Sequence, residues 1–384
     1  MWSGPVYTVR LMLFLILVNF FALAGCQSIF ETRYMRVQRD EDSIVLISSV
    51  FGQERIREPL LVDLLQSPSL RRLASILQHG NWYYCANRAA YSRLEHSINV
   101  FLLVRKAGGS LLEQAAALLH DVSHTAFSHS GASFFTDDFV AADHLQDQLH
   151  EYYITGSDIK IILEHYDIAV ADILPDSNGF IRLERELPDL CADRIEYNIM
   201  GGLYEGLITE DQARTLVQAI HFSSTQSCWY FDAIDTALLF SRNAIYMTIA
   251  LWTSPYSVVS TKMLAYALRR AGQLGILTRE DVLFGSDEKL FRIMASCNDA
   301  LLQKFLGGFQ DPHTAFTFSG EGEHKIFCKF RGVDPLILAE DTLCRLSEIE
   351  RSFAWYYTHM KDVFSRGWSI YYTSDLISAI ESIS

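Results

Sequence analysis

Two neighbouring segments that each begin with a helix-capping signal constrain the fold of this chain most strongly. Residues 92–95 and 110–113 both carry the capping-box pattern, a serine followed three positions later by a glutamate. Apolar residues at helical spacing follow each signal, and the glycine pair at 108–109 marks the end of the first segment. The sequence therefore predicts two consecutive helices, with His96 near the start of the first and His120-Asp121 in the last turn of the second.

The side chains at these positions suit a metal ion. His96, His120, Asp121 and the later Asp193 offer two imidazoles and two carboxylates, a mixed set suited to a Lewis-acid ion that activates water. Neighbouring helical residues point about 100° apart, so an adjacent histidine and aspartate reach one ion only near a helix end. A lone histidine after an apolar helix is ordinarily a core or capping residue, but five of the twelve histidines fall within residues 96–144.

These motifs resemble those of the HD-domain metal-dependent phosphohydrolases, in particular the deoxynucleoside triphosphate triphosphohydrolase branch. Residues 93–97 (Arg-Leu-Glu-His-Ser) are similar to that branch's R-F-E-H-S, and residues 120–129 to its H-D-x-x-H-x-x-F-S-H. Upstream, residues 67–80 resemble S-P-x-x-x-R-L-x-x-I-x-Q-x-G. The similarity covers residues 50–168 and returns around Asp193.

The resemblance implies a role for each matching residue. One divalent metal ion (Mn, Fe, Zn, Co, Ni or Mg) would be bound by His96, His120, Asp121 and Asp193. The substrate would be bound by Gln78, by Tyr197 and by Arg93, whose planar guanidinium clamps phosphate.

The resemblance also implies a set of catalytic residues, Arg93 among them. His124 and His129 would line the phosphate channel, with one of them transferring a proton. A further histidine is either His150 or His144, and we favour His150 because the family follows this histidine with glutamate and apolar residues, as here.

The chain departs from the family pattern after the last metal ligand. The family reads D-x-x-D-Y-x-x-R-D and places the tyrosine and the final aspartate beside the sugar. Here Asp193 and Tyr197 are kept, whereas Met200 and Gly201 replace the arginine and aspartate. The metal chemistry survives this change, but recognition of a deoxyribose 3′-hydroxyl does not follow.

Composition agrees with a compact helical enzyme. With 384 residues, 49% of them hydrophobic, the chain can bury a large core, and its 8 prolines favour long helices. We predict an all-α HD-type helical bundle: a catalytic core at 45–205, a helical lobe at 206–310 packed on it, and a small α+β extension at 311–384. In the extension, segments 315–318 and 325–330 are expected to form a hairpin, and residues 368–373 another strand. The net charge of −14 argues against a general nucleic-acid-binding surface.

The N-terminus gives two opposite expectations about location. An apolar run ends in Leu-Ala-Gly-Cys26, which resembles a bacterial lipobox, so residues 1–26 would be a signal peptide and Cys26 the lipid-bearing residue of an outer-membrane or periplasmic lipoprotein. Alternatively, translation starts at Met35 and the protein is cytoplasmic. The seven cysteines lack CxxC spacing, which favours reduced thiols over disulfides.

The sequence thus predicts a metal-dependent phosphohydrolase acting on a small phosphorylated substrate, a nucleotide such as a dNTP or a related phosphoester. One alternative is a phosphodiesterase for a cyclic or dinucleotide substrate. Another is a non-catalytic, membrane-anchored scaffold that binds metal only to fold. Homo-oligomerisation is left open.

Overall fold

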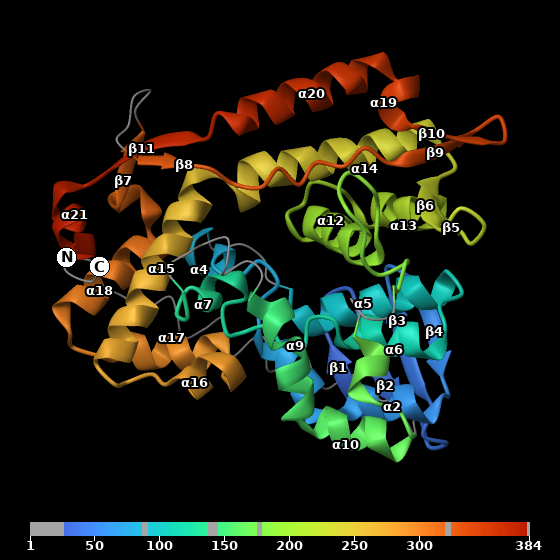
Figure 1. Ribbon diagram of the computed structural model, residues 1–384, viewed down its shortest axis with the longest axis horizontal. Coiled ribbons are helices and arrows are strands. Elements are labelled where there is room, and N and C mark those ends of the chain that lie inside the picture. Colours follow the sequence, from blue (N-terminus) through green and yellow to red (C-terminus); the bar gives the residue numbers. More distant parts are fainter. Residues whose placement is uncertain (1–26, 87–90, 137–144, 175–178, 319–323, 382–384) are drawn as a thin grey trace, which may run out of the picture.

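The computed structural model describes residues 27–86, 91–136, 145–174, 179–318 and 324–381 (Figure 1). Cys26, with the leader before it, and His144 lie outside these residues. Among the described segments, none forms a helix that is both long and apolar enough to cross a bilayer. The six cysteines of the described chain are all free thiols, in agreement with their scattered spacing.

Helices form most of the described chain. Before the site they are α2 (Pro59–Gln66), α3 (Pro68–Arg71), η1 (Arg72–Ser75) and α4 (Trp82–Ala86). The site and its surroundings are built from α5 (Arg93–Lys106), α6 (Leu111–Leu119), α7 (His129–Ala132), α9 (Leu145–Thr155), α10 (Asp158–His165), η2 (Val170–Ile173) and α12 (Ala192–Tyr204). The later ones are α13 (Glu210–Ala219), α14 (Ile234–Met247), η3 (Thr248–Trp252), α15 (Pro255–Gln273), α16 (Arg279–Phe284), α17 (Asp287–Ala295), α18 (Ala300–Gln310), η4 (Pro312–Thr314), α19 (Leu346–Ile349), α20 (Arg351–Ser365) and α21 (Ser374–Glu381).

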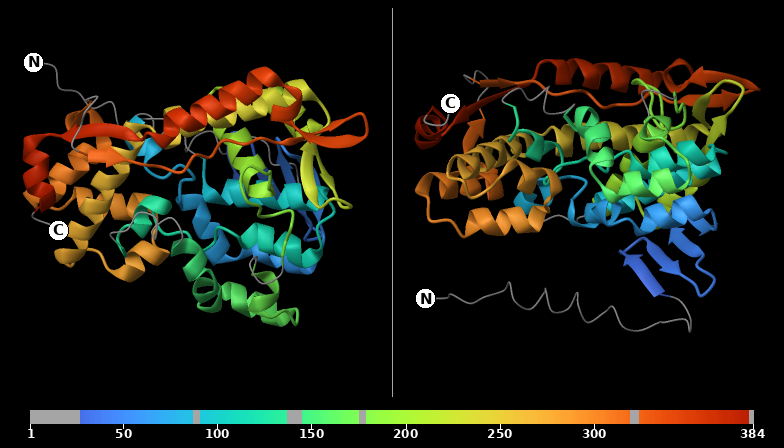
Figure 2. Two further views of the ribbon diagram at one scale, coloured as in Figure 1. Left: turned by 45° about the horizontal axis from the view of Figure 1, so that its top comes forward. Right: turned by 60° about the horizontal axis from the view of Figure 1, so that its bottom comes forward.

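The expectation of an all-α core needs correction, because the described residues also contain eleven strands in three sheets. The first sheet is an antiparallel meander of β1 (Gln27–Glu31), β2 (Arg36–Arg39), β3 (Val45–Ser49) and β4 (Gly52–Ile56), visible as the blue strands in Figure 2 (right). In β3, alternate residues are buried, as in a sheet with one face on the core. Residue 45, the expected start of the catalytic core, is the first residue of β3, and its partner strand β2 precedes it.

Helix α5 contacts both α6 and α12. Its first twelve residues, 93–104, are all buried, including the polar ones. A helix buried all round belongs to the interior, and polar residues there need internal partners. The buried polar side chains of α5 therefore indicate a functional site.

The second sheet joins parts of the chain that the sequence assigned to different domains. It has the order β10-β9-β6-β5 and consists of β5 (Ile220–Ser223), β6 (Cys228–Phe231), β9 (Leu336–Ala339) and β10 (Thr342–Arg345). Strands β6 and β9 pair in parallel, so the C-terminal extension completes a sheet begun by the preceding lobe.

The third sheet overturns the predicted hairpin. Strands β7 (Phe316–Phe318) and β8 (His324–Ile326) do not pair with each other, because β11 (Trp368–Tyr372) lies between them and pairs antiparallel with both. Residue Ile370 of this central strand is fully buried. Strand β11 was expected from its sequence, but its place in the middle of the sheet was not. Helices α17 and α18 are separate, because Asp299 caps α18 by accepting a bond from the Leu302 amide at 2.8 Å.

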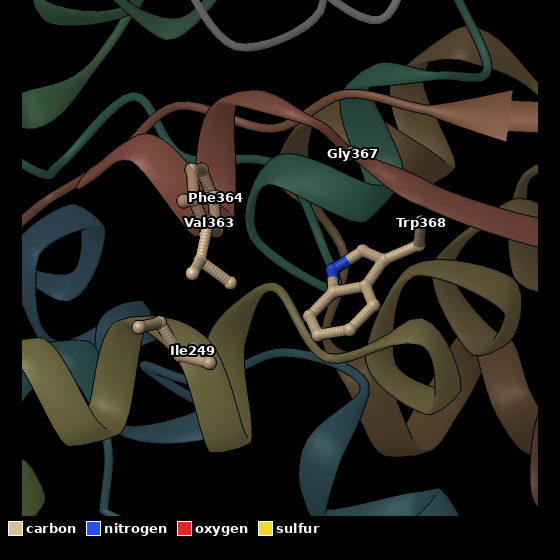
Figure 3. A pocket seen from close by; sticks show the side chains of 5 residues that line it. All are labelled: Ile249, Val363, Phe364, Gly367 and Trp368. Atoms are coloured by element: carbon tan, nitrogen blue, oxygen red, sulfur yellow. The ribbon is translucent and has the colours of Figure 1, made fainter. Parts of the chain in front are cut away.

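The C-terminal extension holds the π-helical turn η3 in place. Figure 3 shows Ile249 of η3 beside Val363, Phe364 and Trp368, which together line a small apolar pocket. The indole Nε1 of Trp368 donates to the Thr253 carbonyl at 2.8 Å, just after the turn. Such π-turns are frequent at functional sites, and Trp252 at the end of η3 contributes to the site described next.

Candidate metal centre

The structure brings the four predicted metal ligands together. From His96 Nε2, the distance is 3.2 Å to His120 Nε2, 3.0 Å to Asp193 Oδ1 and 3.5 Å to Asp121 Oδ2. The donor atoms of His96, His120 and Asp121 are close enough to share one ion. Three of the four side chains are buried, whereas that of Asp193 is 25% exposed, so the cluster opens to solvent on the Asp193 side.

Local sequence sets the position of each ligand. The Ser92 hydroxyl accepts a bond from the Glu95 amide, so α5 begins at Arg93 and His96 lies in its first turn. Helix α6 ends at Leu119, which leaves His120 as its C-cap and Asp121 in the following turn. The helix-end geometry predicted for the adjacent pair is confirmed.

Only the serine half of each predicted capping box forms. The Glu113 carboxylate accepts bonds from the backbone and side chain of Arg182, at 3.0 and 2.7 Å. The Glu95 carboxylate accepts from the Tyr204 hydroxyl at 2.8 Å. Both glutamates thus join α5 and α6 to later parts of the chain instead of closing their own helix ends.

Two further contacts orient the ligand imidazoles. His120 Nδ1 lies 2.8 Å from the Ala117 carbonyl, so it donates there and turns Nε2 toward the cluster. His96 Nδ1 bonds to the buried carboxylate of Glu196, whose other oxygen accepts from Asn99 Nδ2 at 2.9 Å. Partners of this kind fix the tautomer and orientation of metal-bound histidines. Sequence reasoning missed Glu196, although its position three residues after Asp193 puts both on one face of α12.

The charges around the cluster favour a cation. Burial opposes protonation of His96, but Glu196, Asp193 and Asp121 outweigh it and raise the pKa of His96 to about 10. The same balance raises the pKa of His120, where the carboxylate of Asp121 contributes most against burial. Two nitrogen and two carboxylate donors in a field that attracts positive charge fit a divalent metal ion.

Arg93 is buried next to the cluster. Its Nη1 pairs with Asp121 Oδ2, and its Nε donates to Ser128 Oγ at 2.7 Å. Despite burial, the Arg93 charge holds the pKa of Asp121 well below its usual range, so this carboxylate is ionised. The structure therefore places the predicted phosphate clamp directly beside Asp121, a predicted metal ligand.

The three predicted catalytic histidines occupy different positions. His124 is buried, with Nε2 at 3.2 Å from Asp121 Oδ1, and its ring packs edge-on against exposed His129 at a centroid distance of 4.8 Å. His150 is buried on α9, where its Nδ1 contacts Ser123 Oγ at 3.1 Å. Its Nε2 has no hydrogen-bond partner among the described residues.

The predicted substrate-binding residues come from three parts of the chain, namely α5 for Arg93, α12 for Tyr197 and the segment before α4 for Gln78. Gln78 precedes α4, and its buried Oε1 lacks a partner within the described chain. Tyr197 lies on α12, where its ring packs edge-on against Trp252 at 5.4 Å between centroids. Burial raises the pKa of Tyr197 to about 12, so its hydroxyl stays protonated at neutral pH.

Comparison with known proteins agrees with this geometry. The sequence model of the HD domain matches residues 93–193, the segment that contains all four predicted ligands. An uncharacterized Bacillus subtilis protein, YdhJ, is 30% identical over 303 residues, which cover 78% of this chain and 90% of that protein. The metal-dependent phosphohydrolase cns2 of Cordyceps militaris is 30% identical over 56% of this chain, and the match spans 63% of its length. Human deoxynucleoside triphosphate triphosphohydrolase SAMHD1 is 30% identical over 34% of this chain and 24% of its own length.

Solved structures share the fold. A phosphohydrolase from Bacteroides thetaiotaomicron superposes with a TM-score of 0.56 at 17% identity, over 82% of this chain and 94% of that one. A hypothetical protein from Aquifex aeolicus gives a TM-score of 0.60 at 15% identity, over 89% and 100%. Because the ligand geometry, the domain match and the long Bacillus alignment coincide on the same residues, this chain belongs to the HD-domain metal-dependent phosphohydrolases.

Proposed function

We propose that this protein hydrolyses a phosphate ester of a nucleotide at the His96 cluster. The observation that carries the proposal is the convergence of His96, His120, Asp121 and Asp193, with Arg93 and His124 packed against Asp121. A divalent metal ion held by these four residues supplies Lewis acidity toward a phosphate oxygen and activates water. The chain itself supplies the surrounding charge and proton-transfer groups.

Arg93 and His124 have complementary tasks in this proposal. Arg93 keeps Asp121 ionised and provides positive charge for the developing charge on a phosphate. Burial and the Arg93 charge hold the pKa of His124 well below its ordinary range, so the imidazole is neutral at pH 7. With Nε2 engaged by Asp121, Nδ1 is the nitrogen available to accept a proton.

His129 and His150 complete the proposed set. His129 is exposed next to His124 and is placed to exchange that proton with solvent. The Nδ1 of His150 contacts the Ser123 hydroxyl, and its Nε2 has no partner among the described residues. When Nδ1 accepts from Ser123, Nε2 carries the proton and can donate a hydrogen bond to a phosphate oxygen.

The proposed substrate class is supported by the relatives and qualified by one difference from their sequence pattern. SAMHD1 proteins of several vertebrates, which match parts of this chain, are named deoxynucleoside triphosphate triphosphohydrolases. Because Met200 and Gly201 stand where that branch has arginine and aspartate, we expect little discrimination between ribose and deoxyribose. The same replacement keeps a phosphodiesterase acting on cyclic or dinucleotide substrates as a second candidate.

A metal and substrate screen tests the proposal. The purified protein is stripped of metal, reloaded separately with Mn, Fe, Zn, Co, Ni or Mg, and assayed with ribo- and deoxynucleoside triphosphates, cyclic nucleotides and dinucleotides. We expect hydrolysis of at least one nucleotide, one bound metal per chain, and loss of both metal and turnover in Asp121→Ala. The exposed Asp232→Ala serves as the matched control.

The products distinguish the candidates. Tripolyphosphate release identifies a triphosphohydrolase, and nucleoside monophosphate from a cyclic or dinucleotide substrate identifies a phosphodiesterase. Metal binding without turnover of any nucleotide would contradict the proposal and favour the scaffold alternative.

A further inference from the structure

Arg72, the first residue of η1, donates hydrogen bonds to backbone carbonyls of the loop that carries His124. Its Nη2 lies 2.5 Å from the carbonyl oxygen of His124 and 3.1 Å from that of Val122, and its Nη1 lies 3.1 Å from that of Gly285. Its Nε is buried and has no partner among the described residues. The bonds from Nη2 therefore attach η1 to the backbone of the His124 loop.

A guanidinium group suits this task better than other side chains do. Its planar fork stays charged and presents five N–H groups in fixed directions, so it can bind several carbonyls at once. Hydrogen bonds from a charged donor are also about twice as strong as neutral ones. A lysine carries all its donors on one nitrogen and cannot reproduce the bonds that Arg72 makes from two nitrogens.

The same guanidinium packs on α9, the helix that carries His150. The Cζ atom of Arg72 lies 5.1 Å from the centre of the Tyr153 ring, within the range of a cation–π contact. Tyr153 follows His150 by three residues, so the two side chains lie on one face of α9. On that face, His150 Nδ1 contacts Ser123 Oγ at 3.1 Å. Arg72 thus touches both the loop of His124 and the helix of His150.

Other contacts hold the two ends of this loop. Upstream, Asp121 is paired with Arg93. Downstream, the Ala126 amide donates to a carbonyl of α16 at 2.9 Å, and the Phe127 amide donates to the first residue of α17 at 2.6 Å. Loss of the Arg72 side chain should therefore loosen residues 122–124 and leave the predicted metal ligand in place.

We propose that Arg72 is a positioning residue that fixes the imidazoles of His124 and His150 relative to the metal cluster without touching the substrate. This inference rests on the proposed nucleotide hydrolysis, in which both histidines take part. Among the described residues, the hydrogen bonds of Arg72 go to none of the predicted metal ligands or substrate-binding residues. A displacement of about 1 Å in a reacting group can lower a rate about 100-fold, so the effect should appear in kcat.

The test measures turnover, metal content and local mobility on the same variants. Arg72→Met removes the donors but keeps an unbranched side chain, and Arg72→Lys keeps the charge on one nitrogen. Arg71→Met changes the exposed neighbouring arginine and is the matched control. Each manganese-loaded protein is assayed with adenosine and deoxyadenosine triphosphates and with cyclic AMP, and its manganese is counted per chain. Amide hydrogen exchange, followed by mass spectrometry, reports on residues 120–128 and on α14 independently of activity.

We expect Arg72→Met to lower kcat about 10- to 100-fold, with KM and manganese content within about twofold of the wild type. Amide exchange at residues 122–124 should become about tenfold faster, while exchange in α14 stays unchanged. Arg72→Lys should recover part of kcat, and Arg71→Met should match the wild type.

Three results overturn the assignment of Arg72 while nucleotide hydrolysis stands: an unchanged kcat, a parallel loss of manganese, or faster exchange throughout the chain. The second would make Arg72 a support of the metal cluster, and the third a support of general stability. If Arg72→Met does not fold, Arg72→Lys decides by the same measurements. A wild-type protein that hydrolyses none of these nucleotides overturns the proposed function and the catalytic role of Arg72 with it, whereas the exchange rates decide separately whether Arg72 holds the loop.

Discussion

Glu196 shows how a single residue can hold a predicted metal ligand in position. Its side chain is fully buried, one oxygen bonding to His96 Nδ1 and the other to Asn99 Nδ2. A buried carboxylate without partners would lower the stability of the fold by several kcal/mol, so burial of Glu196 depends on its bonds to His96 and Asn99. Glu196 is therefore a positioning residue for His96.

Glu196→Gln is expected to weaken metal binding about 10- to 100-fold, because the amide holds the imidazole less firmly and lowers its basicity. Competition with a metal-chelating dye measures the affinity, and the exposed Glu164→Gln is the control. A larger drop is expected for Asp121→Ala, which removes a ligand. Unchanged affinity in Glu196→Gln would show that His96 is oriented by other contacts.

At the scale of elements, α17 joins two segments of the site. Asp287, its first residue, accepts bonds from the Leu77 amide at 2.9 Å and the Phe127 amide at 2.6 Å. The Leu77 amide belongs to residues 77–80, which precede α4, and the Phe127 amide belongs to the loop that carries Ser128. Burial raises the pKa of Asp287 to about 7, yet both oxygens are used as acceptors.

Asp287→Ala should lower the free energy of unfolding by about 2–4 kcal/mol, because two buried amides lose their acceptor. Asp287→Asn keeps one acceptor oxygen and should fall between the wild type and the alanine variant. Urea unfolding measures both, with exposed Glu288→Ala as the neighbouring control. If Asp287→Ala lowers the free energy of unfolding no more than the control does, Asp287 does not join the two segments.

The contact between the C-terminal extension and η3 is a second link between elements. Trp368 donates to Thr253 and packs with Ile249, so it holds the turn that carries Trp252. Trp368→Phe should cost about 1 kcal/mol of stability from the lost hydrogen bond, and Trp368→Ala more, as packing is lost too. Exposed Trp355→Phe is the control for unfolding. Equal stability of Trp368→Phe and the wild type would exclude the bond as a stabilising contact.

At the scale of the whole molecule, buried neutral histidines make stability depend on pH. Burial lowers the pKa of both His79 and His150 to about 4, whereas an unfolded histidine titrates near 6.5. Between these values the unfolded chain binds protons that the native chain does not. The stability is therefore complete above pH ~6.5 and is lost as the pH falls toward about 4.

Each of these histidines should contribute about 1.4 kcal/mol per pH unit to the slope of unfolding free energy in that window. Urea unfolding at several pH values compares the wild type with the double variant His79→Phe, His150→Phe. Carboxylates such as Asp121 are present in both proteins, so the difference in slope isolates the histidines. An identical slope would mean that neither histidine is held neutral in the folded state.

The sequence by itself determined the helices of the candidate site and the positions of the predicted ligands on them. Ser92 and Ser110 each cap their helix through an amide three residues away, so signals within one turn fix where His96 and His120-Asp121 lie. The lipidation expected at Cys26 stays a prediction.

Only the tertiary structure decided what these local elements meet. The pairing of β11 between β7 and β8, and of β6 with β9, joins strands far apart in the chain that carry no mutual signal in their sequences. Glu196 with His96, Asp287 with Leu77, and Gly201 with His79 are likewise long-range contacts. Helix caps depend on neighbours in sequence, whereas burial and pairing depend on neighbours in space. The helix positions of the predicted ligands could therefore be read from the sequence, but the residues that support them could not.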